Sequence, residues 1–205
     1  NIVDCDLAES ISVSAVIFEK PTTKFMVHQY DFSKEPVTSV AKDILQESIQ
    51  NPWVKAIEIY HCISSFSTTA LCDGLSGLAS DIQVFGGIVC SPDITSPNSC
   101  VFSSVGGYSK SALLVVFYGG EDFYVQSRKI SGWKPIGRNF HVTRSDGNIL
   151  YELGGVPAYE VYNKYLSIKN DQNFFYNALE FPMLYEHNGV SIVRAAGASN
   201  PDGSL

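Results

Sequence analysis

Residues 36–60 read PVTSVAKDILQESIQNPWVKAIEIY, and the pattern of this stretch changes from that of a helix to that of a strand. In the first half, apolar residues recur at the period of an amphipathic helix that opens at Pro36 and ends at Asn51-Pro52. The second half, residues 54–60, is rich in β-branched residues and reads as a strand. A helix that leads directly into a strand is typical of an α/β fold.

The same patterns predict further elements on both sides of this stretch. Residues 12–18 and 25–30 read as a β-hairpin that turns across residues 19–24. A second amphipathic helix carries Leu71, Leu75 and Leu78 on one face, and a buried strand at 82–85 stops at Gly86-Gly87. Additional strands are expected at residues 100–104, 111–118, 123–125, 140–143, 149–153 and 191–194, and helices at 157–165 and 171–179.

Together these elements predict an α/β fold with mixed, hairpin-rich sheets and helices packed on the sheet faces. The hairpin patterns at 16–27 and 115–125 resemble each other, with Gly119-Gly120 as the turn of the second. Two readings of this likeness stay open: two related halves of the chain, or the general similarity of amphipathic hairpins.

Composition narrows the class of protein. The chain has 205 residues, of which 45% are hydrophobic, so it can build a sizeable core. Its 14 basic against 21 acidic residues give a net charge of −7, which argues against binding to nucleic acid or an anionic membrane. The chain has five cysteines, an odd number, and no two of them have C-x-x-C spacing. This pattern does not suggest a framework of disulfides and favours a reducing, cytoplasmic compartment.

The most distinctive sequence lies in the second half of the chain. The turn Gly132-Trp133-Lys134-Pro135-Ile136-Gly137 precedes a strand with His141-Val142-Thr143, a hairpin, the turn Gly155-Val156-Pro157-Ala158 and a helix. This order closely resembles the FIST family of sensory domains. The resemblance covers residues 54–205, and one departure is Gly154, where the family more often has an acidic residue.

The resemblance implies a division of the chain and a function. Residues 1–180 would form a FIST N-terminal-type domain, truncated at its start, and residues 181–205 the beginning of a FIST C-terminal-type region. Family members are mostly bacterial and archaeal sensors that bind small ligands such as amino acids and regulate a fused output, for example a diguanylate cyclase, or a partner kinase. We therefore expect a cytoplasmic ligand sensor, not an enzyme, within a longer protein. A haem-based nitric-oxide or gas sensor and an uncharacterised hydrolase are the alternatives.

The candidate ligand site begins at two strand ends. Ser64, Ser65 and Phe66 lie between a predicted strand and helix, where backbone N–H groups suit a carboxylate or phosphate, although helix capping alone also explains them. Gly86 and Gly87 permit close approach of the backbone to a ligand or to another strand. Ligands of open α/β sheets settle beyond the carboxyl ends of strands, so we expect both segments to contribute.

Three further residues complete the predicted site. Trp133 suits either a pocket wall or a staple that holds its turn to the core. Arg138 and Arg194 suit a carboxylate ligand, because arginine binds carboxylates with two parallel hydrogen bonds, but each also suits an intramolecular ion pair. We expect the Trp133 turn to meet the two strand ends.

No motif predicts catalysis or a metal centre. Residues 119–123 mimic the signature of diguanylate cyclases, but they lack its metal-binding partner and read as a turn between strands. The four histidines show no metal-ligand spacing, so no cofactor is expected. His61, close to a strand end, is the residue we would assign as axial ligand if the chain binds haem.

Overall fold

The computed structural model describes residues 15–62, 68–89, 99–128, 132–187 and 190–205. The chain divides into two compact units, Asn1–Lys129 and Ile130–Leu205. Each unit has helices and strands of its own, so the α/β class predicted from the sequence is confirmed. None of the helices within the described ranges is long and apolar enough to cross a membrane.

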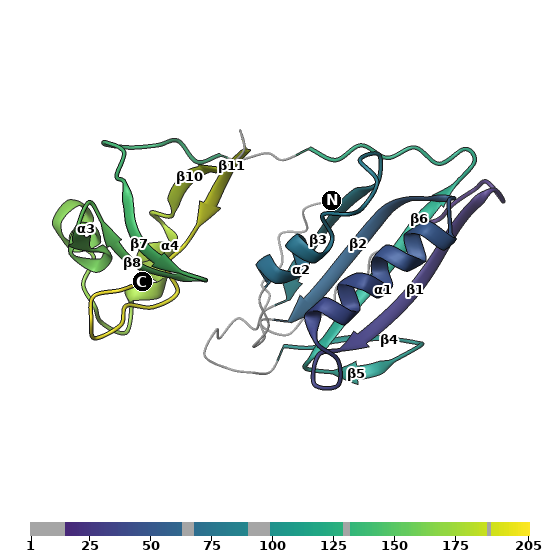
Figure 1. Cartoon of the computed structure of the whole chain (residues 1–205), viewed down its shortest axis with the longest axis horizontal. Helices are drawn as coiled ribbons and strands as arrows, with labels where there is room; N and C mark the ends of the chain where they lie inside the picture. Colours follow the sequence, from purple (N-terminus) through teal and green to yellow (C-terminus); the bar gives the residue numbers. More distant parts are fainter. Residues whose placement is uncertain (1–14, 63–67, 90–98, 129–131, 188–189) are drawn as a thin grey trace. The chain divides into compact units, whose positions relative to one another are not determined.

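The first unit is built on a four-stranded sheet with the order β1-β6-β2-β3. The strands are β1 (Thr23–Asp31), β2 (Val54–Cys62), β3 (Gln83–Val89) and β6 (Ala112–Gly120). Both β1 and β2 run antiparallel to β6, whereas β3 runs parallel to β2. Helix α1 (Val37–Gln50) crosses one face of this sheet, as Figure 1 shows, and α2 (Thr68–Gly74) contacts α1. A small hairpin of β4 (Val101–Ser103) and β5 (Gly107–Ser109) completes the unit.

The core of the first unit lies between α1 and the sheet. The helix buries Val40 and Ile44, and the facing strands bury Ile57, Leu113 and Phe117, all fully inaccessible to solvent. Ile57 pairs with Phe117 across β2 and β6. Every second residue of each strand therefore faces α1, and the apolar face of the amphipathic helix packs against these side chains. This match is the reason that the sequence from 36 to 60 predicts the fold correctly.

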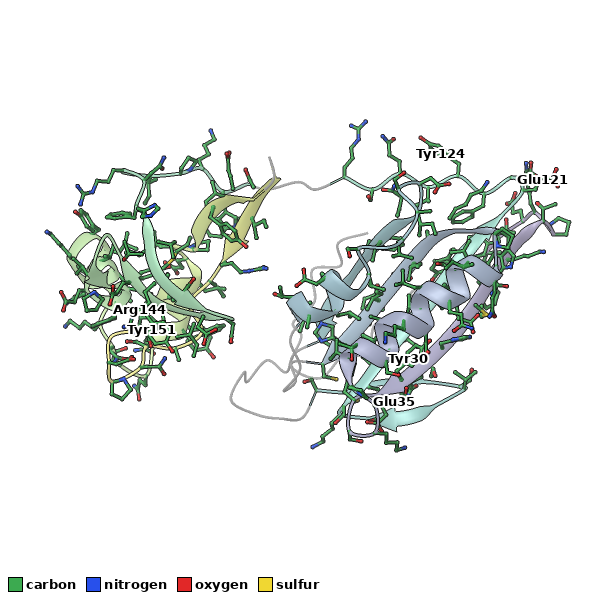
Figure 2. All side chains as sticks on the ribbon, in the orientation of Figure 1. Tyr30, Glu35, Glu121, Tyr124, Arg144 and Tyr151 are labelled. Atoms are coloured by element: carbon green, nitrogen blue, oxygen red, sulfur yellow. The ribbon has the colours of Figure 1, made fainter. Side chains whose placement is uncertain are left out.

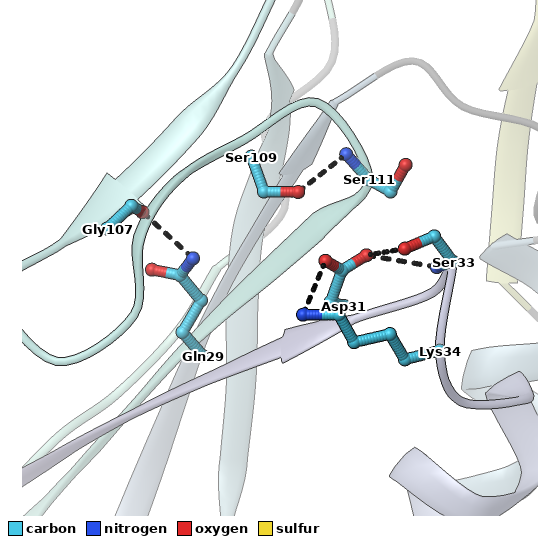
Figure 3. A network of polar contacts seen from close by, with 7 residues as sticks. All are labelled: Gln29, Asp31, Ser33, Lys34, Gly107, Ser109 and Ser111. Atoms are coloured by element: carbon cyan, nitrogen blue, oxygen red, sulfur yellow. Dashed lines mark hydrogen bonds and ion pairs between the residues drawn. The ribbon is translucent and has the colours of Figure 1, made fainter.

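Asp31 closes the turn that joins β1 to α1 (Figure 3). Its Oδ1 accepts hydrogen bonds from the backbone N–H of Ser33, at 3.0 Å, and from the Ser33 hydroxyl, at 2.7 Å. Lys34 Nζ lies 3.6 Å from Oδ2. The hydrogen bonds from Ser33, and more weakly the charge of Lys34, lower the pKa of the Asp31 carboxyl. In the same view the Gln29 amide donates to the carbonyl of Gly107, which fastens β1 to the β4–β5 hairpin.

Within its described residues, the second unit has two small sheets and two helices. One sheet has the order β7-β8-β9 and the other is the hairpin β10-β11. Its elements are β7 (Val142–Asp146), β8 (Ile149–Leu153), β9 (Val156–Pro157), α3 (Ala158–Leu166), α4 (Phe174–Leu179), β10 (Met183–His187) and β11 (Val190–Arg194). The buried side chains of its core are Tyr162, Ile168, Phe174, Ala178 and Ala196.

Most predicted elements are confirmed, within a few residues at their ends. The predicted helices at 36–51 and 157–165 correspond to α1 and α3, and the predicted strand at 54–60 corresponds to β2. The helix expected at 171–179 is shorter and begins at Phe174. The pairing of 140–143 with 149–153 is the β7–β8 hairpin.

Two predicted hairpins are wrong. Within the described residues, 15–20 form no strand, and 123–125 form none either. Instead β1 pairs with β6, so that Met26 lies opposite Phe117 and Phe25 opposite Tyr118. The two segments that resemble each other are thus partners in one sheet. Alternating hydrophobicity identifies a strand but carries no information about which strand it pairs with.

The strand after α2 also differs from its prediction. It runs through Gly86 and Gly87 to Val89 instead of stopping at the glycines, and its side chains are largely exposed, with Phe85 at 39% and Ile88 at 53%. The reason is its position at the edge of the sheet, where β2 is its neighbour on one side only. A short apolar run does not distinguish an edge strand from a buried one.

Candidate functional site

The predicted site residues fall in both units of the chain. Ser64, Ser65 and Phe66 lie outside the described residues. The described members are Gly86 and Gly87 in the first unit, and Trp133, Arg138 and Arg194 in the second. Their convergence on one ligand therefore stays a prediction.

Gly86 has a structural reason for being glycine. Its φ of 148° is a conformation that side chains rarely allow, and a Cβ at this position would lie 1.8 Å from the carbonyl oxygen of Ile59 on β2. Of the two roles that the sequence leaves open, close approach to another strand is thus present at Gly86. Gly87 differs, because a Cβ there would meet only the ring of Tyr60, at 3.8 Å.

Gly87 and Tyr60 lie beside a group of residues on β2 and β6 that is not part of the predicted site. Along β2, Ile57 and Ile59 pack in the core with α1, so the alternating Glu58 and Tyr60 point to the opposite face of the sheet. We call this the outer face. The Tyr60 hydroxyl donates to Glu58 Oε1 at 2.6 Å, and the Tyr118 hydroxyl donates to Oε2 at 2.7 Å. One carboxylate on the outer face therefore holds two tyrosines.

Both tyrosines on the outer face stay protonated at neutral pH. The hydrogen bond to Glu58, together with burial, raises the pKa of Tyr60. Burial first, and then the hydrogen bond to Glu58, raises the pKa of Tyr118 far above its usual value. Their hydroxyls consequently act as donors, and the Glu58 carboxylate is their acceptor.

Aromatic rings surround one side of this group. The rings of Tyr118 and Phe123 stack at 9° with centroids 6.4 Å apart, and the Phe18 ring lies 6.1 Å from each. Lys55 holds the segment with Phe123 in place, since its ammonium donates to the Phe123 carbonyl at 3.1 Å. The sequence does contain one signal of this group: Glu58 is an acidic residue between two isoleucines of β2, Ile57 and Ile59.

Arg138 in the second unit is held by aromatic side chains. Its guanidinium lies 5.0 Å from the ring centre of Phe140 and 5.5 Å from that of Tyr165. The same group donates a hydrogen bond to the Tyr165 hydroxyl at 2.7 Å. These two rings contact each other edge to face, so the arginine is fixed by a preformed aromatic pair. No acidic side chain among the described residues forms an ion pair with Arg138.

Arg144, on β7, provides a contrast within the same unit. Its guanidinium stacks 4.3 Å above the Tyr151 ring, and Figure 2 shows the two residues together. Unlike Arg138, it also donates to a carboxylate, Glu152 Oε1, at 3.1 Å. The charge of Arg144 is thus matched inside the fold. An intramolecular ion pair was the alternative for Arg138 and Arg194; among the described residues neither forms one, whereas Arg144, which was not a candidate, does.

The two remaining predicted residues lie on the surface of the second unit. Trp133 is 50% exposed in an irregular segment. Arg194 is the last residue of β11 and is exposed opposite Met183 of β10. Exposure leaves both side chains accessible to a ligand, but their part in a site stays a prediction.

His61, the residue assigned as axial ligand if the chain binds haem, lies near the end of β2, and that role stays a prediction. The ring is only 5% exposed and its Nδ1 lies 2.7 Å from the Cys62 carbonyl, so Nδ1 carries the proton. The other nitrogen, Nε2, is 3.4 Å from the Thr68 hydroxyl at the start of α2. His61 joins the end of β2 to the start of α2.

A shallow groove of about 320 Å³ runs between β1 and α1. It is lined by His28, Tyr30, Asp43, Gln46, Glu47 and Gln50. Burial, together with the charges of Asp43 and Glu47, raises the pKa of Tyr30 well above its usual value. Across the described part of the chain, no three or more His, Cys, Asp or Glu side chains are arranged to hold a metal ion.

Comparison with known families assigns the class of protein. The model of the FIST N domain matches residues 3–156, which is most of the chain and ends at Val156 in the second unit. The chain therefore belongs to the FIST family, a family of sensory domains, as the sequence resemblance predicted. No curated protein and no solved structure gives a significant match.

Proposed function

We propose that this chain is the small-ligand-binding input domain of a cytoplasmic signal-transduction protein. Its ligand is an amino acid or a similar carboxylate-bearing metabolite, and binding regulates an output domain such as a diguanylate cyclase, or a partner kinase. Membership of the FIST family supports the sensory role. The observation that supports a carboxylate-bearing ligand is that the Arg138 guanidinium is held by two aromatic rings and has no acidic partner among the described residues.

Arg138 has the features of an arginine prepared for an anion. Its guanidinium is oriented by Phe140 and Tyr165, and only one of its donors is used by a described side chain, the Tyr165 hydroxyl. Guanidinium has five N–H donors in a planar fork that matches a carboxylate. Because the aromatic pair already restricts the side chain, binding a carboxylate there costs less conformational entropy than binding to a flexible arginine.

The proposal is tested with the common L-amino acids, added one at a time to the purified chain in a thermal-shift screen and then measured by calorimetry. A ligand that binds only the folded state raises the unfolding temperature. Replacing Arg138 with Gln removes a charged hydrogen bond, typically about 1.5–3 kcal/mol, so affinity should fall about tenfold or more. Arg144→Gln is the matched control, since Arg144 also stacks on a ring but is already paired with Glu152.

Three results would count against this function. If no amino acid binds, the ligand class is wrong. If Arg138→Gln binds as tightly as the parent, Arg138 is not the carboxylate-binding residue. If Arg144→Gln weakens binding equally, the effect belongs to the stability of the second unit, which unfolding experiments on both variants would show.

A further inference from the structure

The Glu58 carboxylate on the outer face lacks a cationic partner within the described part of the chain. It is partly buried, and each of its oxygens accepts one tyrosine hydroxyl. A carboxylate has about four lone-pair positions, so the two hydroxyls leave acceptor capacity on both oxygens. Placing a carboxylate in partly apolar surroundings without a counter-charge is costly, and a bound cation would offset that cost.

The side chains around Glu58 favour a cation over a neutral group. The faces of aromatic rings carry partial negative charge, and Tyr118, Phe123 and Phe18 form a contiguous set of rings next to the carboxylate. Lys55, the neighbouring basic residue on β2, is held by the Phe123 and Glu121 carbonyls. A ligand cation at Glu58 would therefore not compete with Lys55 for the same contacts.

At the edge of the sheet, the residues of β3 that lie opposite Tyr60 and Glu58 are a glycine and an exposed aromatic residue. Gly87 lies opposite Tyr60 in the register of β2 and β3 and has no side chain to cover the tyrosine ring. Phe85 lies opposite Glu58 in the same register and is 39% exposed. Glu58 is thus flanked by an accessible aromatic ring on the β3 side and by the Tyr118 group on the β6 side.

We propose that Glu58, Tyr60 and Tyr118 form a binding site for a primary ammonium group on an organic cation. The ammonium donates to the remaining lone pairs of Glu58, and its carbon chain and positive charge lie against the rings of Tyr118 and Phe85. The site goes beyond the function proposed above, because it requires neither a carboxylate on the ligand nor any residue of the second unit.

The experiment uses n-butylammonium chloride as the probe and the whole isotopically labelled chain. Binding is followed by the NMR signals of Glu58, Tyr60 and Tyr118, against sodium chloride at the same ionic strength. We expect saturable shifts with a dissociation constant on the order of 1 mM. Glu58→Gln should weaken binding at least about tenfold, since it removes the charge and keeps the shape. Glu121→Gln, which removes an exposed acid whose backbone carbonyl accepts from Lys55, should bind as the parent does.

Two further probes act on the parent chain and keep the test decisive if Glu58→Gln does not fold. 1-Butanol has the shape of the probe without its charge, and tetramethylammonium has the charge without N–H donors. Both should bind several-fold more weakly than butylammonium. Equal binding of butanol, equal or tighter binding of tetramethylammonium, or unchanged affinity in a folded Glu58→Gln variant would each overturn the proposal. Absence of saturable shifts with butylammonium would do the same. Arg138→Gln should leave this binding unchanged, which separates the two sites experimentally.

Discussion

Replacing Gly86 with Ala tests whether this glycine serves the sheet or the ligand. A Cβ at Gly86 would lie 1.8 Å from the Ile59 carbonyl oxygen, whereas carbon and oxygen atoms in close contact between strands are about 3.3 Å apart. The strands β2 and β3 must therefore separate locally by more than about 1 Å. We expect this separation to cost about as much free energy as the loss of one hydrogen bond between the strands, about 1 kcal/mol. The strained φ of 148° adds about 1–3 kcal/mol for alanine. We expect Gly86→Ala to lower the free energy of unfolding by about 2–4 kcal/mol.

Gly87→Ala is the matched control for this change. Its Cβ would make an ordinary contact with the Tyr60 ring, and the backbone there needs no positive φ. The variant should be neutral or more stable by up to about 1 kcal/mol, because alanine reduces the freedom of the unfolded chain. Urea unfolding followed by circular dichroism measures both variants. If Gly86→Ala unfolds at the urea concentration of the parent, the steric reasoning is refuted. A stable Gly86→Ala variant with weakened ligand binding would instead favour the ligand role.

Four further substitutions test other parts of the fold. Ser167→Gly should raise stability by about 0.5–1 kcal/mol in thermal unfolding, because Ser167 ends α3 with a φ of 56° that glycine adopts more easily. Asp31→Asn should destabilise the chain at pH 7. The lowered pKa of Asp31 contributes stability that is present above the carboxyl's unfolded pKa and lost as pH falls through its folded pKa, so parent and variant should converge below about pH 4. Ser204→Ala should lower the free energy of unfolding by about 1–2 kcal/mol, since the buried Ser204 hydroxyl donates to Asp202. Ser199→Ala should leave the free energy of unfolding unchanged or raise it, since the buried Ser199 hydroxyl has no partner within the described structure.

The sequence predicts those elements whose hydrophobic period is complete within one segment. The helix from Val37 and the strand from Val54 are examples, because each carries a full apolar face of its own. Pairing between distant segments is a property of the whole fold, and so the partnership of β1 with β6 was not predictable from either strand. Residues 15–20 resemble a strand in composition but form none, which shows that β-branched residues alone do not specify a partner.

For the candidate site, the sequence predicts which types of residue could bind a ligand, but not which side chains surround them in the fold. The type of residue at Arg138 predicts carboxylate binding, because a guanidinium suits a carboxylate. Its aromatic support comes from Phe140, two residues later in an irregular segment, and from Tyr165, near the C-terminal end of α3. Glu58 is not predicted as a site residue from the sequence, because an acid in a strand resembles an exposed polar position. Its two tyrosine donors become neighbours only when β6 pairs with β2, across 60 residues of sequence between Glu58 and Tyr118. A site that is assembled by the pairing of two strands can therefore be recognised only after the register of those strands is known. For the proposed site at Glu58, the feature that then identifies it is the carboxylate without a cationic partner among the described residues.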